Sequence, residues 1–417
     1  MKHYCTATVL TSAKSSRPRA GFRSMRSGGE WPADQTRARP LNVRQSGNGL
    51  GSGSCRAYDP CTLPNLRVVL KVAGAFMAFL IGAGFATGQE ILQFFASEGL
   101  RGVGGGFIFL AAGTYLAITL LLLGHRRGFH NSDAVFRYYA GSVAGTAFAW
   151  YAIVVLYSIY VVMLAGAGAL LHEYLNVPVP VGGAVMALAV FAMVFFGLHE
   201  LVAVIGSIGP VLVALIIIVA GAALFDNAGR VVAGDAVAHS LDMLHASPTW
   251  WMSGLLYTAL SILGLAGFLP ALGATIPSRR DLVYAGIAGP VLFTLALSLS
   301  TLALLAGLPE VNGRMIPMLD LATRAVPVVA SIFPWIILTG IFTTAAPMLW
   351  ITVVKFTQDG GPRYRILAAA LSLLGYVAGT ALPYDRLLNL IYPTIGYSGT
   401  ALIALILLKQ VRTRSFS

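Results

Sequence analysis

Long apolar runs separated by short polar connections follow one another along the chain from about residue 66 to residue 410. Runs of about 18 or more apolar residues are long enough to cross the hydrocarbon core of a bilayer as helices. The pattern therefore predicts an all-α polytopic membrane protein. Ten transmembrane helices are expected, at 68–96, 103–124, 147–171, 180–197, 201–225, 249–273, 284–307, 326–353, 366–382 and 386–408.

The charges in the connections predict how these spans are oriented. Basic residues gather in alternate connections, namely Arg126, Arg127 and Arg137, then Arg279 and Arg280, then Lys355, Arg363 and Arg365, and last Lys409, Arg412 and Arg414. The opposite connections are richer in acidic residues, namely Glu98, Glu173, Asp226, Asp235, Asp242, Glu310, Asp320 and Asp385. The positive-inside rule then predicts that both termini lie in the cytoplasm. We expect a multi-pass protein of the cytoplasmic (inner) membrane. The connection near His199 has no Lys or Arg and gives the weakest signal.

Composition excludes a soluble protein. The chain is 57% hydrophobic and only 11% charged, with a mean hydropathy of +0.77. The net charge of +12 does not indicate a nucleic-acid partner, because much of it lies in an N-terminal segment and in the basic connections. All three cysteines precede the first span, so the membrane body has no disulfide, thiolate metal site or cysteine nucleophile.

Residues 1–65 differ in composition from everything that follows. This segment is rich in Arg, Ser, Gly and Pro, and it holds ten Lys/Arg against three Asp/Glu. It cannot bury enough apolar surface to offset its ordering entropy, so we expect a disordered basic tail. A transit peptide and a start site assigned too far upstream both remain open. The transmembrane domain is expected over 66–410, followed by a short cytoplasmic tail over 411–417.

Spans 1 and 6 share an unusual feature. Span 1 contains FLIGAGFATGQE and span 6 contains LYTALSILGLAGFLPALG, so closely spaced glycines interrupt both. The two spans are five apart, and an odd separation means that they cross the membrane in opposite directions. This pattern predicts a five-plus-five inverted repeat with broken helices 1 and 6, whose breaks mark a midplane transport site.

The breaks also suggest chemistry. Unwinding frees backbone groups that lipid cannot satisfy, so protein, water or a ligand must do so. The freed N–H groups suit an anion, and the freed carbonyls suit a small cation. The residues expected to bind substrate here are Gly82, Gly84, Thr87, Gly88, Gln89 and Glu90 in span 1, and Ser261, Gly264, Gly267 and Phe268 in span 6. The competing interpretation is that these glycines only allow close helix packing, as small residues often do in membranes.

Glu90 is the only carboxylate well inside an apolar span. A charged group there is costly, so its default interpretation is functional. The alternative is a carboxylate that caps a half-helix and faces a wet vestibule.

The stretch GAGFATGQEILQFF, followed by EGLRGVGGG, resembles the signature of the YkvI-type membrane proteins. These are members of the amino acid–polyamine–organocation superfamily, whose LeuT-type fold has five plus five inverted helices. The resemblance covers about residues 66–410 and implies a carrier. It does not supply the substrate.

The wider superfamily implies further roles. Many sodium-coupled members have two adjacent hydroxyl residues in span 8, which here resemble Thr343 and Thr344 beside the carbonyl of Gly340; the carbonyls of Ala78 and Ile81 would complete the Na⁺ site. The alternative is a threonine pair that bonds back to its own helix.

Tyr157 and Tyr160, three residues apart in span 3, resemble substrate-facing tyrosines of related carriers, although packing is an open alternative. Phe268, just after the expected break in span 6, is a candidate gate residue of the substrate site, with aromatic packing as the open alternative. Glu90 departs from the amino acid carriers, because a carboxylate there would repel the carboxylate of a simple amino acid.

No Walker A, HExxH or Gly-x-Ser-x-Gly sequence occurs, so neither ATP-driven transport nor an enzyme is expected. The leading hypothesis is a secondary active transporter that imports an amino acid or similar small organic solute by alternating access, coupled to Na⁺ and without a cofactor. One alternative is a proton-coupled carrier that uses Glu90. Another is a non-transporting sensor or assembly protein that has kept the fold. The sequence does not predict the oligomeric state.

Overall fold

The computed structural model describes residues 64–129, 132–196, 201–357 and 361–414. Two compact units divide between Cys61 and Thr62, and all described residues belong to the second unit, Thr62–Ser417. The expected N-terminal tail therefore lies almost wholly outside the described residues, as do the connection at 197–200 and the last three residues. The proposed division at 65/66 and 410/411 stays a prediction.

Every regular element in the described part of the chain is a helix. The α-helices are α1 (Leu66–Leu80), α2 (Ala83–Thr87), α3 (Gln89–Phe94), α4 (Leu100–Arg127), α5 (Ser132–Leu175), α6 (Val179–Phe196), α7 (Leu201–Asn227), α8 (Val231–Ala238), α9 (Trp250–Thr275), α10 (Arg279–Ala306), α11 (Leu308–Val311), α12 (Pro317–Ala325), α13 (Pro327–Ala330), α14 (Phe333–Val354), α15 (Pro362–Gly379) and α16 (Tyr384–Arg414). The prediction of an all-α fold is confirmed.

Seven helical stretches within the described residues are long and apolar enough to cross a membrane. They are Leu100–Arg127, Ser132–Leu175, Val211–Ala238, Trp250–Thr275, Arg279–Ala306, Val328–Val354 and Tyr384–Arg412. The other three expected spans correspond to the interrupted α1–α3, to α6 and to α15. The chain is therefore a polytopic membrane protein, while the count of ten spans stays a prediction.

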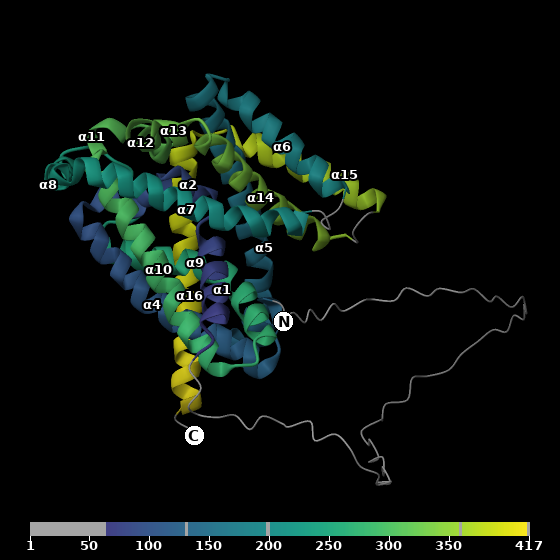
Figure 1. Ribbon diagram of the computed structural model, residues 1–417. Coiled ribbons are helices and arrows are strands. Elements are labelled where there is room, and N and C mark those ends of the chain that lie inside the picture. The colour runs from purple at the N-terminus through teal and green to yellow at the C-terminus, as the bar shows by residue number, and fades with distance from the viewer. Residues whose placement is uncertain (1–63, 130–131, 197–200, 358–360, 415–417) are drawn as a thin grey trace, which may run out of the picture. The chain divides into compact units, whose positions relative to one another are not determined.

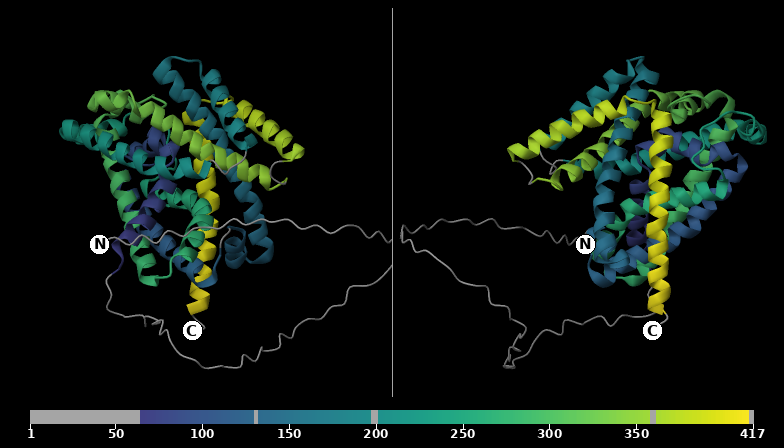
Figure 2. Two further views of the ribbon diagram at one scale, coloured as in Figure 1. Left: turned by 45° about the vertical axis from the view of Figure 1, so that its right-hand side comes forward. Right: turned by 180° about the vertical axis from the view of Figure 1, so that it is seen from behind.

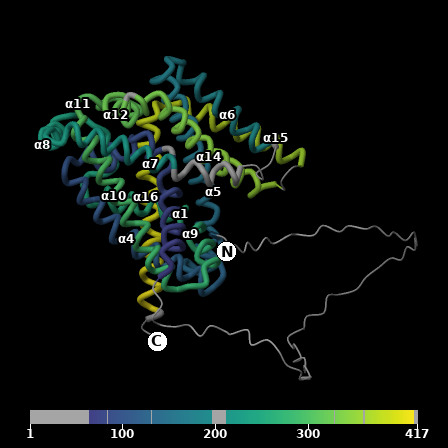
Figure 3. The backbone as a smooth tube through the Cα atoms, viewed as in Figure 1, coloured from purple at the N-terminus to yellow at the C-terminus, as the bar shows by residue number. Residues whose placement is uncertain are grey.

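Helix pairing follows the symmetry expected of two inverted halves. α4 packs along α9 and α1 along α10, which pairs span 2 with span 6 and span 1 with span 7. In the same way, α5 packs on α15 and α14 on α6, which pairs span 3 with 9 and span 8 with 4. If each span of the first half is exchanged with its equivalent in the second half (1 with 6, 2 with 7, and so on), the 2–6 pair becomes the 7–1 pair and the 3–9 pair becomes the 8–4 pair. Figure 3 shows α6, α14 and α15 running obliquely to α1, α4 and α10.

Close backbone contacts show that two spans of equal parity, α4 and α9, run in the same direction. A Cβ on Gly254 of α9 would lie 2.3 Å from the carbonyl oxygen of Gly105 of α4, and further along the same helices a Cβ on Gly273 would lie 2.1 Å from that of Leu121. The two helices, spans 2 and 6, are therefore parallel. The glycines are needed because any side chain would push the backbones apart.

The basic connections gather at one end of the unit, here called the basic end. A ring nitrogen of His125 lies 2.9 Å from the carbonyl oxygen of Ile276, and Lys355 lies 3.2 Å from Asp133. Lys409, near the end of α16, sits 3.9 Å from the ring centroid of Tyr138. α16 runs the length of the unit to this end (Figures 1 and 2).

The opposite, acidic end is held by other contacts. The N–H of Leu100 donates to Asp235 at 2.7 Å, and the carboxylate of Glu173 accepts the N–H of Met315 at 2.6 Å. The predicted alternation of the connections therefore holds within the described residues. Which end faces the cytoplasm stays a prediction.

The expected break in span 6 is wrong. α9 is one continuous helix from Trp250 to Thr275, with Pro270 inside it. Its glycines provide room for neighbours instead, because a Cβ on Gly264 would lie 2.8 Å from the ring of Phe79 and one on Gly267 would lie 3.2 Å from Ser132. Gly264 and Gly267 therefore allow close packing in span 6, and their assignment to a substrate site stays a prediction.

Candidate substrate-binding site

Span 1 is broken, as the sequence predicts, and it is broken twice. α1 ends at Leu80, and the N–H of Gly82 donates to the carbonyl of Leu80 at 2.9 Å rather than to that of Ala78, its partner in a regular helix. The second break is at Gly88, whose φ of +84° lies in the left-handed region that favours glycine. A Cβ on Gly88 would also lie 3.0 Å from the backbone nitrogen of Met318 in α12.

A cavity of about 720 Å³ lies beside the first break. It is lined from α1, α2, α3, α5, α9, α14 and α16, and its surface is mostly apolar. Ten of the residues expected to bind substrate or ion lie in the lining, namely Ala78, Gly82, Gly84, Glu90, Ser261, Gly264, Gly267, Phe268, Thr343 and Thr344. From Glu90 the cavity extends to Asp133 and Lys355 at the basic end.

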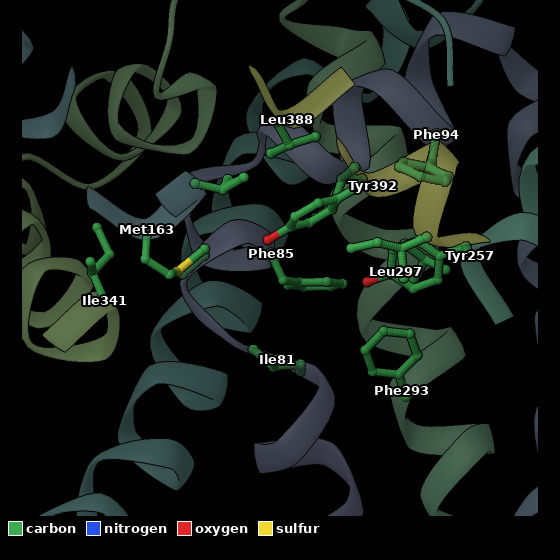
Figure 4. Close-up of a cluster of buried hydrophobic side chains, with 14 of the residues drawn as sticks. Ile81, Phe85, Phe94, Met163, Tyr257, Phe293, Leu297, Ile341, Leu388 and Tyr392 are labelled. Carbon is green, nitrogen blue, oxygen red and sulfur yellow. The ribbon is translucent and has the colours of Figure 1, made fainter. Parts of the chain in front are cut away.

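Glu90 lies in the first turn of α3 and is only 8% exposed. The hydroxyl of Tyr257 donates to its Oε2 at 3.5 Å. Its Oε1 lies over Gly84, where a Cβ would come within 2.8 Å of that oxygen and within 3.3 Å of the hydroxyl oxygen of Tyr392. Figure 4 shows the hydroxyls of Tyr257 and Tyr392 turned toward Phe85 of α2.

The charges in the cavity do not balance. Its charged lining residues are Glu90, Asp133 and Lys355, and the last two pair with each other at 3.2 Å. Within the described ranges, no Lys, Arg or His makes an ion pair with Glu90. An unpaired carboxylate is costly to bury, so Glu90 needs a proton or a cation as a partner.

Thr343 and Thr344 face the cavity from α14. Their hydroxyls both donate to the carbonyl of Gly340, at 3.0 and 2.8 Å, as the helix-bonding alternative predicts. A Cβ on Gly82 would nevertheless lie only 3.9 Å from the Oγ1 of Thr344, so α14 faces the first break directly. Ile81 is 1% exposed and lies outside the cavity lining, as does Gly340.

The tyrosines of span 3 do not reach the cavity. Tyr157 donates to the carbonyl of Leu371 at 2.8 Å, and the hydroxyl of Tyr160 lies 3.1 Å from that of Ser372, so both face α15. They hold α5 against α15.

The remaining expected residues of span 1 also point elsewhere. Thr87 donates to the carbonyl of Gly84 at 2.8 Å and meets the hydroxyl of Tyr384 at 3.0 Å, which ties the break to α16. Gln89 is 3% exposed, and neither it nor Gly88 lines the cavity.

Tyr257 and Tyr392 also line the cavity beside Glu90, and the sequence did not predict either of them. A pattern could have revealed Tyr257, because it precedes Ser261, Gly264 and Phe268 at helical spacing and so shares their face of span 6. Tyr392, directly before Pro393 in span 10, gave no comparable signal.

Comparisons with known proteins agree with this architecture. The chain is 27% identical over 345 residues to the uncharacterized membrane protein YkvI of Bacillus subtilis (strain 168), covering 82% of this chain and 96% of that protein. It is 22% identical over 358 residues to the uncharacterized protein YyaD of the same organism, covering 84% and 98%. The predicted resemblance to YkvI-type proteins is confirmed. No family model matches the chain.

Solved structures share the fold at low sequence identity. The structure of MhsT in complex with L-phenylalanine is similar with a TM-score of 0.55 and 15% identity, covering 82% of this chain and 88% of that one. The inward-facing conformation of Mhp1 is similar with a TM-score of 0.56 and 13% identity, covering 81% and 75%. The fold is therefore the LeuT type that the sequence predicts.

Proposed function

We propose that this chain is a secondary active transporter that carries a small organic solute by alternating access. The observation that carries the proposal is the apolar cavity beside the first break of span 1, with Glu90 buried in its wall. Non-helical backbone at membrane depth must be buried in protein or line a cavity, and in transporters of this architecture such breaks form the substrate site. A LeuT-type fold adds support, since MhsT of that fold is known with L-phenylalanine bound.

The two ends of the cavity differ in a way that suits alternating access. The lining reaches Asp133 and Lys355 at the basic end. Toward the acidic end, the Gly88 turn lies against Met318 and Pro317 of α12, which cover the break. If the basic end faces the cytoplasm, this arrangement corresponds to an inward-facing state of a carrier.

We further propose that Na⁺ couples transport, bound between the first break and α14. The carbonyl of Ala78 loses its helical partner, and the hydroxyls of Thr343 and Thr344 line the same cavity. Unwound carbonyls together with hydroxyls are ligands that suit Na⁺. Both hydroxyls donate their hydrogen to the carbonyl of Gly340, which leaves the lone pairs of their oxygens to coordinate the ion.

A proton is the second candidate for the coupling ion. The observation that favours it is Glu90, a buried carboxylate with no cationic partner among the described residues. Protonation would remove the cost of its charge during reorientation of the cavity. In this version Glu90→Gln would abolish accumulation but leave exchange of internal for external solute intact.

Gradient-driven accumulation in proteoliposomes tests the proposal. The purified full chain is reconstituted with an inward Na⁺ gradient, an inward K⁺ gradient or a pH gradient, and radiolabelled amino acids, amines and nucleobases are supplied. We expect accumulation with Na⁺ and little with K⁺. Accumulation under the pH gradient alone would show that H⁺, and not Na⁺, is the coupling ion. Failure to accumulate any solute under all three gradients would favour a non-transporting sensor.

A further inference from the structure

We propose that Glu90 receives the protonated amine of the transported solute, so the substrate is an organic amine with a compact apolar body and no free carboxylate. This inference rests on the proposed function, because it assigns the substrate class of the same cavity. It concerns the ligand and not the coupling ion.

The charge balance of the cavity is the first observation that favours an amine. Asp133 and Lys355 neutralise each other, which leaves Glu90 as the uncompensated charge of the lining. An ammonium group would neutralise Glu90 inside a mostly apolar space, where such pairing is strong. A zwitterionic amino acid would bring a second carboxylate into the same space, and repulsion between like charges would oppose its binding.

The geometry of the Glu90 carboxylate is the second observation that favours an amine. Oε2 receives the hydroxyl of Tyr257, whereas Oε1 has no hydrogen-bond partner among the described residues. Oε1 and the hydroxyl oxygen of Tyr392 both approach the same point over Gly84, within 2.8 and 3.3 Å of a Cβ placed there. An ammonium group has three donors and could bond to both oxygens.

The aromatic residues around Tyr257 hold this arrangement in place. The ring of Tyr257 meets those of Phe94, Phe95 and Phe109 edge to face, at centroid distances of 5.4, 5.2 and 5.8 Å. Such packing fixes the ring, so its hydroxyl stays directed at Glu90. The carboxylate is thus positioned before a ligand arrives, which lowers the entropic cost of binding.

The rest of the cavity lining indicates that the body of the ligand is apolar. Phe79 and Phe268 stack at 4.8 Å, and Met163, Leu260 and Met348 add further apolar surface. Polar groups in the wall are few beyond Glu90, the two tyrosines and the hydroxyls of Ser261 and α14. A cavity of about 720 Å³ holds a small alkyl or aryl amine with room to spare.

Matched pairs of ligands test the proposal. Thermal stabilisation and isothermal calorimetry of the purified full chain compare each amine with the amino acid of the same side chain: phenethylamine with phenylalanine, tyramine with tyrosine, isoamylamine with leucine and isobutylamine with valine. We expect at least one amine to bind at least tenfold more tightly than its amino acid. No amine binding at all, or tighter binding by the amino acids, would overturn the proposal.

A single substitution links that preference to Glu90. In Glu90→Gln, which keeps shape but removes charge, amine affinity should fall on the order of tenfold to a hundredfold. Amino acid binding should be unchanged or stronger. Asp226→Asn, which neutralises an exposed carboxylate at the end of α7, should change neither. Unchanged amine affinity in a folded Glu90→Gln protein would also overturn the proposal.

Two further measurements keep the outcomes distinct. If Glu90→Gln does not fold, Glu90→Asp takes its place; its shorter arm should weaken amine binding and leave amino acid binding unchanged, and equal affinity for the amine would contradict the proposal. Proteoliposome uptake separates binding from transport. Accumulation of amino acids by both parent and Glu90→Gln would refute the amine assignment and leave the transporter intact. Glu90-dependent amine binding without any accumulation would refute transport and leave the amine site intact.

Discussion

Gly84→Ala should displace the carboxylate of Glu90 without removing its charge. A Cβ at position 84 would lie 2.8 Å from Oε1 and 2.9 Å from Cδ of Glu90, and 3.3 Å from the hydroxyl oxygen of Tyr392. Ordinary contact begins near 3.4 Å, so the carboxylate must move by roughly 0.6 Å or more. The atoms in the way are the far end of a flexible side chain, so the backbone need not shift.

The magnitudes predict a stable but impaired protein. Alanine in a helix is favoured over glycine by about 0.5–1 kcal/mol, which offsets an off-rotamer cost for Glu90 of about 0.5–1.5 kcal/mol. The free energy of unfolding should therefore change by less than about 1 kcal/mol. Loss of one charge-assisted hydrogen bond to the ligand should weaken binding on the order of tenfold.

Thermal unfolding and ligand titration of the purified variant provide the assay. Gly74→Ala is the matched control, because Gly74 is exposed on α1 and a Cβ there has nothing within 4 Å. The control should keep both stability and affinity. If Gly84→Ala binds its ligand and transports it as the parent does, the carboxylate over Gly84 is not part of the site.

Three other predictions follow from the described contacts. Thr343→Ala combined with Thr344→Ala should abolish Na⁺-induced thermal stabilisation and sharply lower uptake; identical uptake of the parent in Na⁺ and K⁺ would contradict the sodium site. Gly124→Ala should lower the melting temperature and the yield, since its Cβ would lie 1.9 Å from the carbonyl oxygen of Pro270. Such overpacking costs about 1–3 kcal/mol or more, whereas Gly229→Ala, with nothing within 4 Å, is the silent control. Tyr157→Phe combined with Tyr160→Phe removes two hydrogen bonds and should destabilise the protein by about 1–3 kcal/mol, while ligand affinity stays within about twofold. A larger loss of affinity with unchanged stability would show that these tyrosines contact the ligand.

Much of the architecture could be predicted because membrane insertion imposes strong rules on the sequence. Apolar runs and basic connections predict the helices and their alternating direction, and the parallel packing of α4 on α9 agrees with that alternation. Gly82, Gly84 and Gly88 predict the broken span 1, because three such residues in so short a stretch disfavour a continuous helix.

The same rule failed in span 6, and the reason is physical. Gly264 and Gly267 are two small residues on one helix, and glycine spacing alone does not distinguish an unwound turn from a close contact. The ring of Phe79 and the start of α5 occupy the space that these glycines leave open. Contacts between segments far apart in the chain decided the outcome, and periodicity carries no information about them.

The candidate site was predicted only in part for a similar reason. Gln89 and Glu90 are successive residues of the short helix α3 and point roughly 100° apart, so only one of them lines the cavity. The two breaks set the direction of α3, and the sequence does not predict which of its faces meets the cavity. Tyr392 joins the site because α16 passes beside α9 and α3, which is a consequence of tertiary packing. The direction of the span 3 tyrosines likewise depends on the position of α15.

The central claim is that a solute travels through the cavity beside broken span 1, and blocking that cavity tests it most directly. All three native cysteines, Cys5, Cys55 and Cys61, precede the first span and can be replaced by serine. In that background Ser261→Cys places one thiol in the cavity wall, whereas Ser331→Cys places it on an exposed connection. The measurement is solute uptake by proteoliposomes before and after complete alkylation. We predict that alkylated Ser261→Cys loses uptake while alkylated Ser331→Cys keeps it; undiminished uptake by fully alkylated Ser261→Cys would contradict the account.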